Sequence, residues 1–171
     1  ARSVAIGQGT LGLQNFTTAT NAYNVAVGYA AGDHITTGIF NTLIGGLAGD
    51  SLSDADFNVA IGQGALTDDT LGSASIAIGR QALTQQNFTT ATNVYNVAVG
   101  HTAGFSVTTG INCTFIGGLA GDAITTANNN VAVGTSALGA ETSGANCTAI
   151  GTNTLAAQNV AGGTNVQNTA V

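Results

Sequence analysis

A glycine that returns at regular intervals constrains the fold of this chain more than any other feature. It closes a short phrase of the type Asn-Val-Ala-Val-Gly. The gaps between successive marker glycines are 21, 17, 17 and 17 residues, and this order then repeats, so four short repeats make a unit of 72 residues. A fixed period is the signature of a stacked repeat architecture. The marker glycines are Gly7, Gly28, Gly45, Gly62, Gly79, Gly100, Gly117, Gly134 and Gly151.

The 72-residue unit is copied closely along the chain. Residues 14–28 and 86–100 agree at 14 of 15 positions and differ only where Ala22 is replaced by Val94. We therefore interpret residues 1–171 as a single repeat array of about 2.4 units, with no second domain. Because both ends of the chain fall inside a repeat, we expect the array to be a segment of a longer chain.

The residues before each marker glycine have the pattern of a β-strand. The position directly before the glycine is always Val or Ile, and β-branched residues favour strands. The chain has 25 Gly and no Pro, a composition that suits short strands joined by turns. We predict an all-β parallel β-solenoid or β-roll with coils of about 17 residues, every fourth coil having 21. As core strand residues we assign Ile6, Val27, Ile44, Ile61, Ile78, Val99, Ile116, Val133 and Ile150.

Both faces of the predicted strands are apolar. The position three before the glycine is Val, Ile or Thr, and the position between these two columns is Ala except at Leu43 and Phe115. Side chains alternate between the two faces of a strand, so one face must fill the coil interior. A strand with one face in water should alternate apolar and polar residues. We therefore expect the second face to be covered either by the opposite wall of the coil or by a neighbouring chain. Of these two we favour a homo-oligomer, a trimer, because the small Ala column would allow close approach.

Two polar columns are predicted to form ladders along the stack. Eight residues after the marker stands Thr in most coils, with Ser53, Asn15, Asn87 and Asn159 in others. Four residues before the marker stands Asn, replaced by Ser3, Ser75, Cys113 and Cys147 in four coils. Stacked amides can hydrogen-bond from coil to coil. The predicted structural ladder is Asn24, Asn41, Asn58, Asn96, Asn130 and Asn168.

Charge argues against several partners. Two basic and eight acidic residues give a net charge of −6, which is unfavourable for binding nucleic acid. No apolar run approaches the roughly 20 residues of a membrane-spanning helix, so we expect no membrane insertion by this segment.

Catalytic and cofactor chemistry is not indicated either. His34 and His101 do not recur with the 72-residue period, so we assign no catalytic residue and expect no enzyme activity. We interpret the acids Asp33, Asp50 and Asp122 as solvated loop residues, and we expect no metal or cofactor. Cys113 and Cys147 are two coils apart, too far to bridge within one chain. Interchain disulfides between trimer mates stay open as an alternative.

The strand phrases resemble a known family of surface proteins. Ser3–Gly7, Asn58–Gly62 and Ser75–Gly79 look like the head repeats of trimeric autotransporter adhesins. The phrase Asn41–Gly49, with the preceding Thr36–Gly38, also resembles repeats of bacteriophage tail-fibre proteins. The resemblance implies a left-handed parallel β-roll that interlocks as a trimer. It also implies a structural or adhesive segment of an extracellular fibre, on a cell surface or a virion.

Other functions stay open as alternatives. Unpaired terminal coils could stack end to end into an extracellular filament, since uncapped strand edges invite pairing. An ice-binding solenoid is a further alternative because of the Thr column. The aromatic residues Tyr23, Tyr95, Phe16 and Phe88 of the long coils either plug a wider coil or form an exposed face for glycans. A host-surface glycan or protein is accordingly a possible partner.

Overall fold

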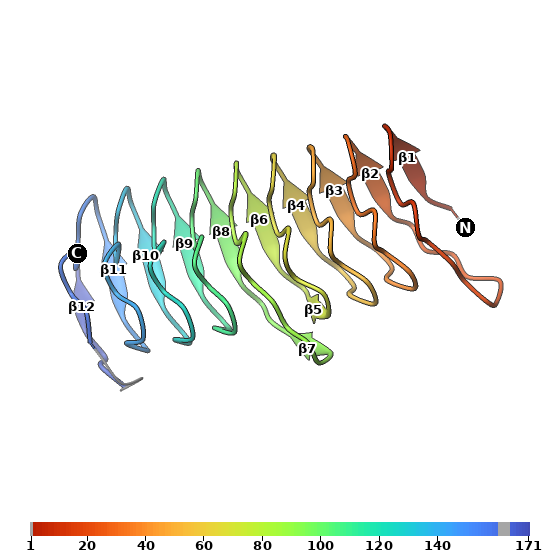
Figure 1. Cartoon of the computed structure of the whole chain (residues 1–171). Coiled ribbons are helices and arrows are strands. Elements are labelled where there is room, and N and C mark those ends of the chain that lie inside the picture. Colours follow the sequence, from red (N-terminus) through yellow and green to blue (C-terminus); the bar gives the residue numbers. More distant parts are fainter. Residues whose placement is uncertain (1, 161–164) are drawn as a thin grey trace.

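The fold is a parallel β-solenoid, seen in a computed structural model that describes residues 2–160 and 165–171. Ten short strands form one sheet in the order β1-β2-β3-β4-β6-β8-β9-β10-β11-β12, and no helix occurs in those ranges (Figure 1). The strands are β1 (Val4–Ile6), β2 (Val25–Val27), β3 (Thr42–Ile44), β4 (Val59–Ile61), β6 (Ile76–Ile78), β8 (Val97–Val99), β9 (Thr114–Ile116), β10 (Val131–Val133), β11 (Thr148–Ile150) and β12 (Thr169–Ala170).

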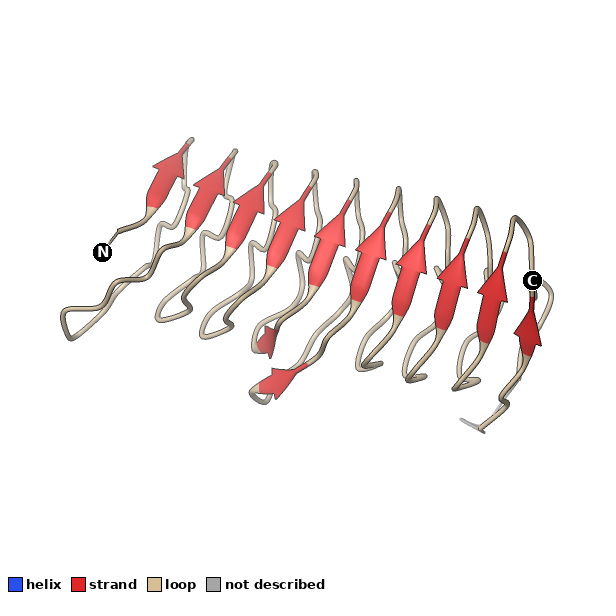
Figure 2. Ribbon diagram, turned by 180° about the vertical axis from the view of Figure 1, so that it is seen from behind, coloured by secondary structure: helices blue, strands red, loops and turns tan. Residues whose placement is uncertain are grey.

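Each strand pairs with the equivalent strand of the next coil. Val25 lies opposite Thr42, and Thr42 lies opposite Val59, with no slip of register. Figure 2 shows the strands side by side along one wall, while the rest of each coil returns behind them. A second, two-stranded sheet, β5 (Gly72–Ser73) with β7 (Thr92–Asn93), forms beside a 21-residue coil. The predicted parallel solenoid of about 17-residue coils is therefore confirmed.

The marker glycines occupy a backbone conformation that other residues avoid. Their φ angles lie between 122° and 146°. They also stack directly on one another, so that a Cβ added to Gly45 would lie 2.6 Å from the carbonyl of Gly62. Both the conformation and the close approach require glycine. The column that revealed the repeat is therefore the point at which the chain turns sharply at the end of each strand.

The core of the solenoid lies in the column between the two β-branched columns. Its residues are completely buried from β2 to β11, and they are Ala26, Leu43, Ala60, Ala77, Ala98, Phe115, Ala132 and Ala149. The predicted core column instead points to the outside, where Ile6 is 59% and Ile44 is 39% exposed. Its nine residues do lie at the ends of strands, but the core assignment is corrected. The coil is thin, and its interior accommodates mainly small side chains from the sheet.

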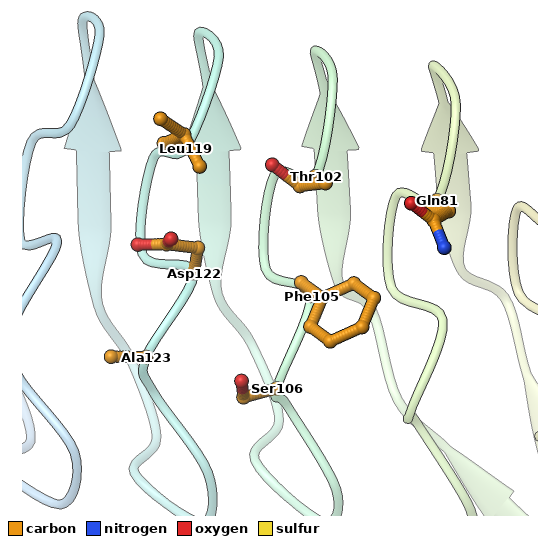
Figure 3. A pocket seen from close by; sticks show the side chains of 7 residues that line it. All are labelled: Gln81, Thr102, Phe105, Ser106, Leu119, Asp122 and Ala123. Atoms are coloured by element: carbon orange, nitrogen blue, oxygen red, sulfur yellow. The ribbon is translucent and has the colours of Figure 1, made fainter.

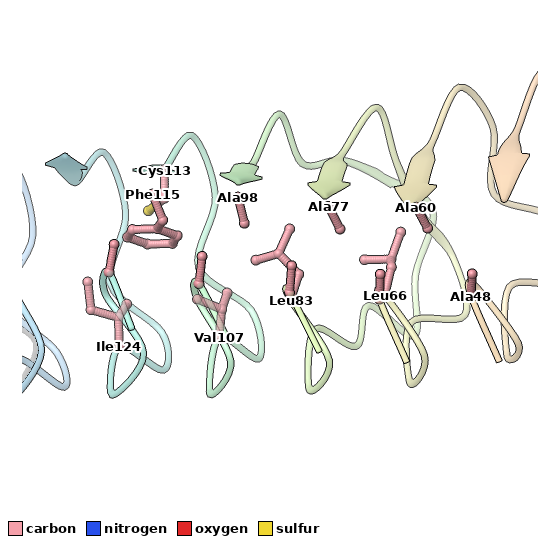
Figure 4. Close-up of a cluster of buried hydrophobic side chains, with 14 of the residues drawn as sticks. Ala48, Ala60, Leu66, Ala77, Leu83, Ala98, Val107, Cys113, Phe115 and Ile124 are labelled. Atoms are coloured by element: carbon pink, nitrogen blue, oxygen red, sulfur yellow. The ribbon is translucent and has the colours of Figure 1, made fainter. Parts of the chain in front are cut away.

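Large and small residues alternate across this thin core. Leu66 and Leu83 rise from the opposite wall toward the Ala column (Figure 4). Where the sheet contributes Leu43 instead, the facing wall has glycine, and a Cβ on Gly32 or Gly49 would lie within 2.8 Å of the Leu43 side chain. The Leu43 side chain thereby fills the space that two glycines leave, as close packing of an interior requires.

Candidate functional surface and buried polar networks

The outer face of the sheet consists of β-branched side chains, most of them apolar. It consists of the first and third residues of each three-residue strand together with Thr169 of β12, and every one of them is at least partly exposed. None is charged. We call this set the outer sheet face. Its residues are Val4, Ile6, Val25, Val27, Thr42, Ile44, Val59, Ile61, Ile76, Ile78, Val97, Val99, Thr114, Ile116, Val131, Val133, Thr148, Ile150 and Thr169.

An aromatic column borders the outer sheet face in the first part of the array. The rings of Tyr23, Phe40 and Phe57 stack with centroids 5.5 and 5.2 Å apart, and Arg2 lies over the Tyr23 ring. The three residues are 42–58% exposed. All three have positive φ angles of 52° to 60°, where side chains other than Gly and Asn are uncommon. In the second 72-residue unit, Asn residues succeed Tyr95 in this column.

The aromatic residues of the long coils therefore divide between the two predicted roles. Tyr95 is 56% and Tyr23 is 42% exposed, both on the outside. Phe88 is only 7% exposed and closes the wider coil, while Phe16 is half-buried in the first coil. The tyrosines are thus available for contact with a partner, and Phe88 acts as the plug.

The Asn ladder bonds to backbone rather than from amide to amide. Asn58 Nδ2 donates to the Gly72 carbonyl at 2.9 Å within its own coil. Its Oδ1 accepts from the Ser75 amide at 2.8 Å in the next coil. The same donor contact recurs at Asn24, Asn41, Asn96 and Asn130, all of which are fully buried. Asn168, in the last coil, is exposed and donates to Gln158 Oε1 at 2.6 Å.

The two cysteines replace asparagine within this ladder. Both are fully buried and free, and the Cys113 Sγ lies 3.4 Å from the Ala127 carbonyl, where it stands in for an amide donor. Burial raises the pKa of the Cys113 thiol to about 11, despite backbone hydrogen bonds that act in the opposite direction. A buried thiol of this kind is a poor nucleophile, because the reactive species is the thiolate.

Two buried carboxylates have no signal in the simple repeat and were missed by the sequence analysis. Asp69 stands seven residues after its marker glycine, where most 17-residue coils have a buried Ile, Leu or Val. It accepts hydrogen bonds from the Phe88 amide at 2.9 Å and from Gln86 Nε2 at 2.5 Å. Gln86 Nε2 also lies 3.1 Å from Ser75 Oγ, and Gln86 Oε1 accepts from Asn96.

The same network returns exactly 72 residues later. Glu141 replaces Asp69, and Gln158 replaces Gln86 and donates to the Glu141 carboxylate at 2.8 Å. Four backbone amides, of Thr142, Ser143, Gly144 and Val160, donate to the same carboxylate at 2.7–3.2 Å. Burial raises the Glu141 pKa, but the hydrogen bonds from Gln158 and the backbone amides lower it more, so the net shift is downward. Comparing the 17-residue coils at this one position would have revealed both acids.

One cluster has the residue types of a metal site. Asp33, His34 and Asp50 offer ligand atoms that lie within 4.8 Å of one another, and His34 Nδ1 is 3.6 Å from Asp50 Oδ1. Burial raises the pKa of Asp50 and the Asp33 carboxylate raises it further, whereas His34 lowers it. The cluster is a surface arrangement of two stacked acids and a histidine. Asp122, the third predicted loop acid, lies elsewhere, and its pKa is raised by burial.

One hollow of the surface is an open groove. Its volume is about 330 Å³, and Figure 3 shows Gln81, Thr102, Phe105 and Asp122 among its lining residues. The Thr column lies elsewhere and is occupied with internal bonds: Thr36, Thr108 and Thr125 each donate to a carbonyl of the next coil at 3.0–3.3 Å. Neither feature assembles a nucleophile with a base.

Comparisons with known proteins give no relative for this chain. No family model, no curated protein and no solved structure matches it. Among the described residues there is also no helix with the length and apolar character needed to cross a membrane.

Proposed function

We propose that this chain is a structural, adhesive segment of an extracellular fibre, in which parallel copies pack through the outer sheet face as a homotrimer. The observation that carries the proposal is the outer sheet face itself, which is ten strands long, mostly apolar and without charge. Contiguous exposed apolar surface of this kind marks interaction sites in soluble proteins. The resemblance of the strand phrases to adhesin repeats supports a location on a cell surface or virion.

A further copy of the same chain is the partner that fits this face best. Its side chains recur at about the 4.8 Å spacing of neighbouring strands, so a partner must present the same period to stay in register over ten coils. A second copy has that period and the same 72-residue modulation. The stack of Tyr23, Phe40 and Phe57 borders the face in the first unit, whereas Asn residues follow Tyr95 in this column of the second unit. This difference between the units favours parallel copies with equal register.

Light scattering on the purified chain tests the assembly. We expect a stable particle of three times the 16.7 kDa chain mass. Ile61→Lys places a charge in the middle of the outer sheet face and should shift the mass toward that of a monomer, since an unpaired buried charge is costly. Gln85→Lys, at an exposed position away from the strands, is the matched control and should leave the trimer intact.

The same measurement separates the alternatives. A clean wild-type monomer would overturn the packing of copies, and thermal hysteresis on that monomer would then support ice binding. The internal bonds of the Thr hydroxyl groups count against this second function. A heavy, polydisperse species that persists in the Ile61→Lys variant would instead support end-to-end filaments. Binding of the trimer to glycan or protein receptors is then measured separately.

A further inference from the structure

Two buried polar atoms at the β1 end of the array have no hydrogen-bond partner among the described residues. They are Ser3 Oγ and Gln14 Nε2. Buried polar groups are nearly always paired, so each exception calls for an explanation. Both atoms belong to the first coil, whose outer side has no further coil stacked on it (Figure 1).

These atoms match positions of the carboxylate network inside the array. Ser3 and Gln14 stand 72 residues before Ser75 and Gln86. Inside the array, Gln86 Nε2 is paired with both the Ser75 hydroxyl and the Asp69 carboxylate of the preceding coil. At Gln158 the amide is again paired with a carboxylate, that of Glu141. The first coil therefore has the amide and hydroxyl of the network but lacks its acid.

The space for the missing group is also present. A hollow of about 320 Å³ is lined by Gln14, Asn15, Phe16, Thr18 and nearby residues. In the equivalent internal loop, the preceding coil fills this place: the Leu71 amide donates to the Phe88 carbonyl, and β5 pairs with β7. Phe88 is buried there, whereas Phe16 is only half-buried.

We propose that the β1 end of the array is a binding surface for one further coil of this repeat, a coil with Asp or Glu seven residues after its marker glycine. The carboxylate of that coil accepts a hydrogen bond from Gln14 Nε2, as Asp69 does from Gln86. This inference concerns the stacking of coils and does not depend on the proposed trimer.

The free end of a second copy does not offer such a coil. Asp69 and Glu141 are both buried beneath the long coils that follow them. The coil at the β12 end has Gln158 at the equivalent position, and direct stacking would place that amide against Gln14. A coil with Asp or Glu at this position supplies the carboxylate that this end of a second copy lacks.

Adding one coil to the complete chain tests the inference. A copy of residues 56–72 fused before Ala1 keeps the register and places its own Asp69 opposite Gln14. The matched chain has Asp69→Leu in the added copy only, because Leu52 occupies this position in another coil. We expect the Asp version to melt at least about 3 °C higher, because a hydrogen bond to a charged group replaces an unpaired buried amide.

Gln14→Leu provides the control for both extended chains. Without the amide, the advantage of the added Asp should disappear and the added Leu version should become the more stable one. Slower exchange of the Gln14 side-chain amide protons with the added Asp would support the bond independently. A Leu version that melts as high as the Asp version while Gln14 is present, with unchanged amide exchange, would overturn the inference.

Discussion

At the scale of single residues, backbone conformation decides which positions tolerate change. Gly45 and Gly46 are adjacent, yet only Gly45 has a positive φ, and only its added Cβ would collide with a neighbouring coil. An added Cβ on Gly46 meets nothing nearer than 3.9 Å. The sequence pattern identified the marker column but not the reason for it, because a recurring glycine does not reveal which atoms approach it.

We predict opposite effects of alanine at these two neighbours. Gly45→Ala should lower the free energy of unfolding by about 3 kcal/mol or more, because it combines backbone strain with a backbone clash. Gly46→Ala should be neutral or stabilise by about 0.4–1 kcal/mol through the unfolded chain. Urea unfolding of both variants measures the difference. Equal losses would show that the marker column does not owe its glycine to the close stack.

The β-branched column shows what the residue pattern leaves open. The two-residue period correctly separates the faces of each strand, but both faces are apolar, so hydrophobicity does not indicate which one points inward. Side-chain size does: the thin coil accommodates Ala60 beneath Leu66, while Ile61 stays outside. A comparison of Leu43 with its facing glycines could have identified the core column from the sequence.

At the scale of the coil, buried side-chain hydrogen bonds connect each repeat to the next one. The Asn ladder was predicted to connect neighbouring coils, and the connection runs through backbone amides and carbonyls, which a sequence column cannot distinguish from amide stacking. The acid–glutamine networks define where a 21-residue coil follows a 17-residue one. The carboxylate is paired with amides alone, so its charge should matter for stability in a pH-dependent way.

We predict that Glu141→Gln destabilises the fold most at neutral pH. The folded pKa of Glu141 is lowered, so its contribution to the unfolding free energy is present above its ordinary pKa and is lost as pH falls through the folded pKa. The loss at pH 7 should be about 1–3 kcal/mol and should shrink below about pH 4. Denaturant unfolding at several pH values measures this dependence.

Asp68→Asn is the control for the opposite sign. Burial raises the pKa of Asp68, so the protonated carboxyl group contributes stability that is lost as it ionises with rising pH. The variant should therefore show no loss at pH 7. If Glu141→Gln cost the same at pH 3 as at pH 7, the role given to its charge would be wrong.

At the scale of the whole molecule, the stability of the array is the sum of contributions from its coils, except where the buried acid–glutamine networks require a particular order of coils. Stability in such stacks is nearly additive, so removing any one coil should cost a similar amount. The sequence period predicted this architecture, because a solenoid follows from local phrases that repeat. It could not predict what covers the outer sheet face, since a partner contributes no residues to the chain's own pattern. The buried networks add a second constraint, on coil order.

We predict that two deletions of equal length differ in cost. Deleting residues 39–55 joins Gly38 to Asp56 in register and keeps Asp69 next to Gln86. Deleting residues 56–72 joins Ala55 to Ser73, also in register, but places the apolar Leu52 against Gln86. The buried Gln86 amide then loses its carboxylate, so the second chain should be less stable by about 2–3 kcal/mol.

Urea unfolding of the two 154-residue chains measures this difference, and Gln86→Leu tests its cause. In the chain that lacks residues 56–72, Gln86→Leu should restore stability, because Leu can pack against Leu52. In the chain that lacks residues 39–55, the same change should destabilise, because it leaves the Asp69 carboxylate without its amide partner. If Gln86→Leu stabilises one chain and destabilises the other, the pairing of one acid with one amide determines coil order. If the two deletion chains are equally stable, the coils are interchangeable.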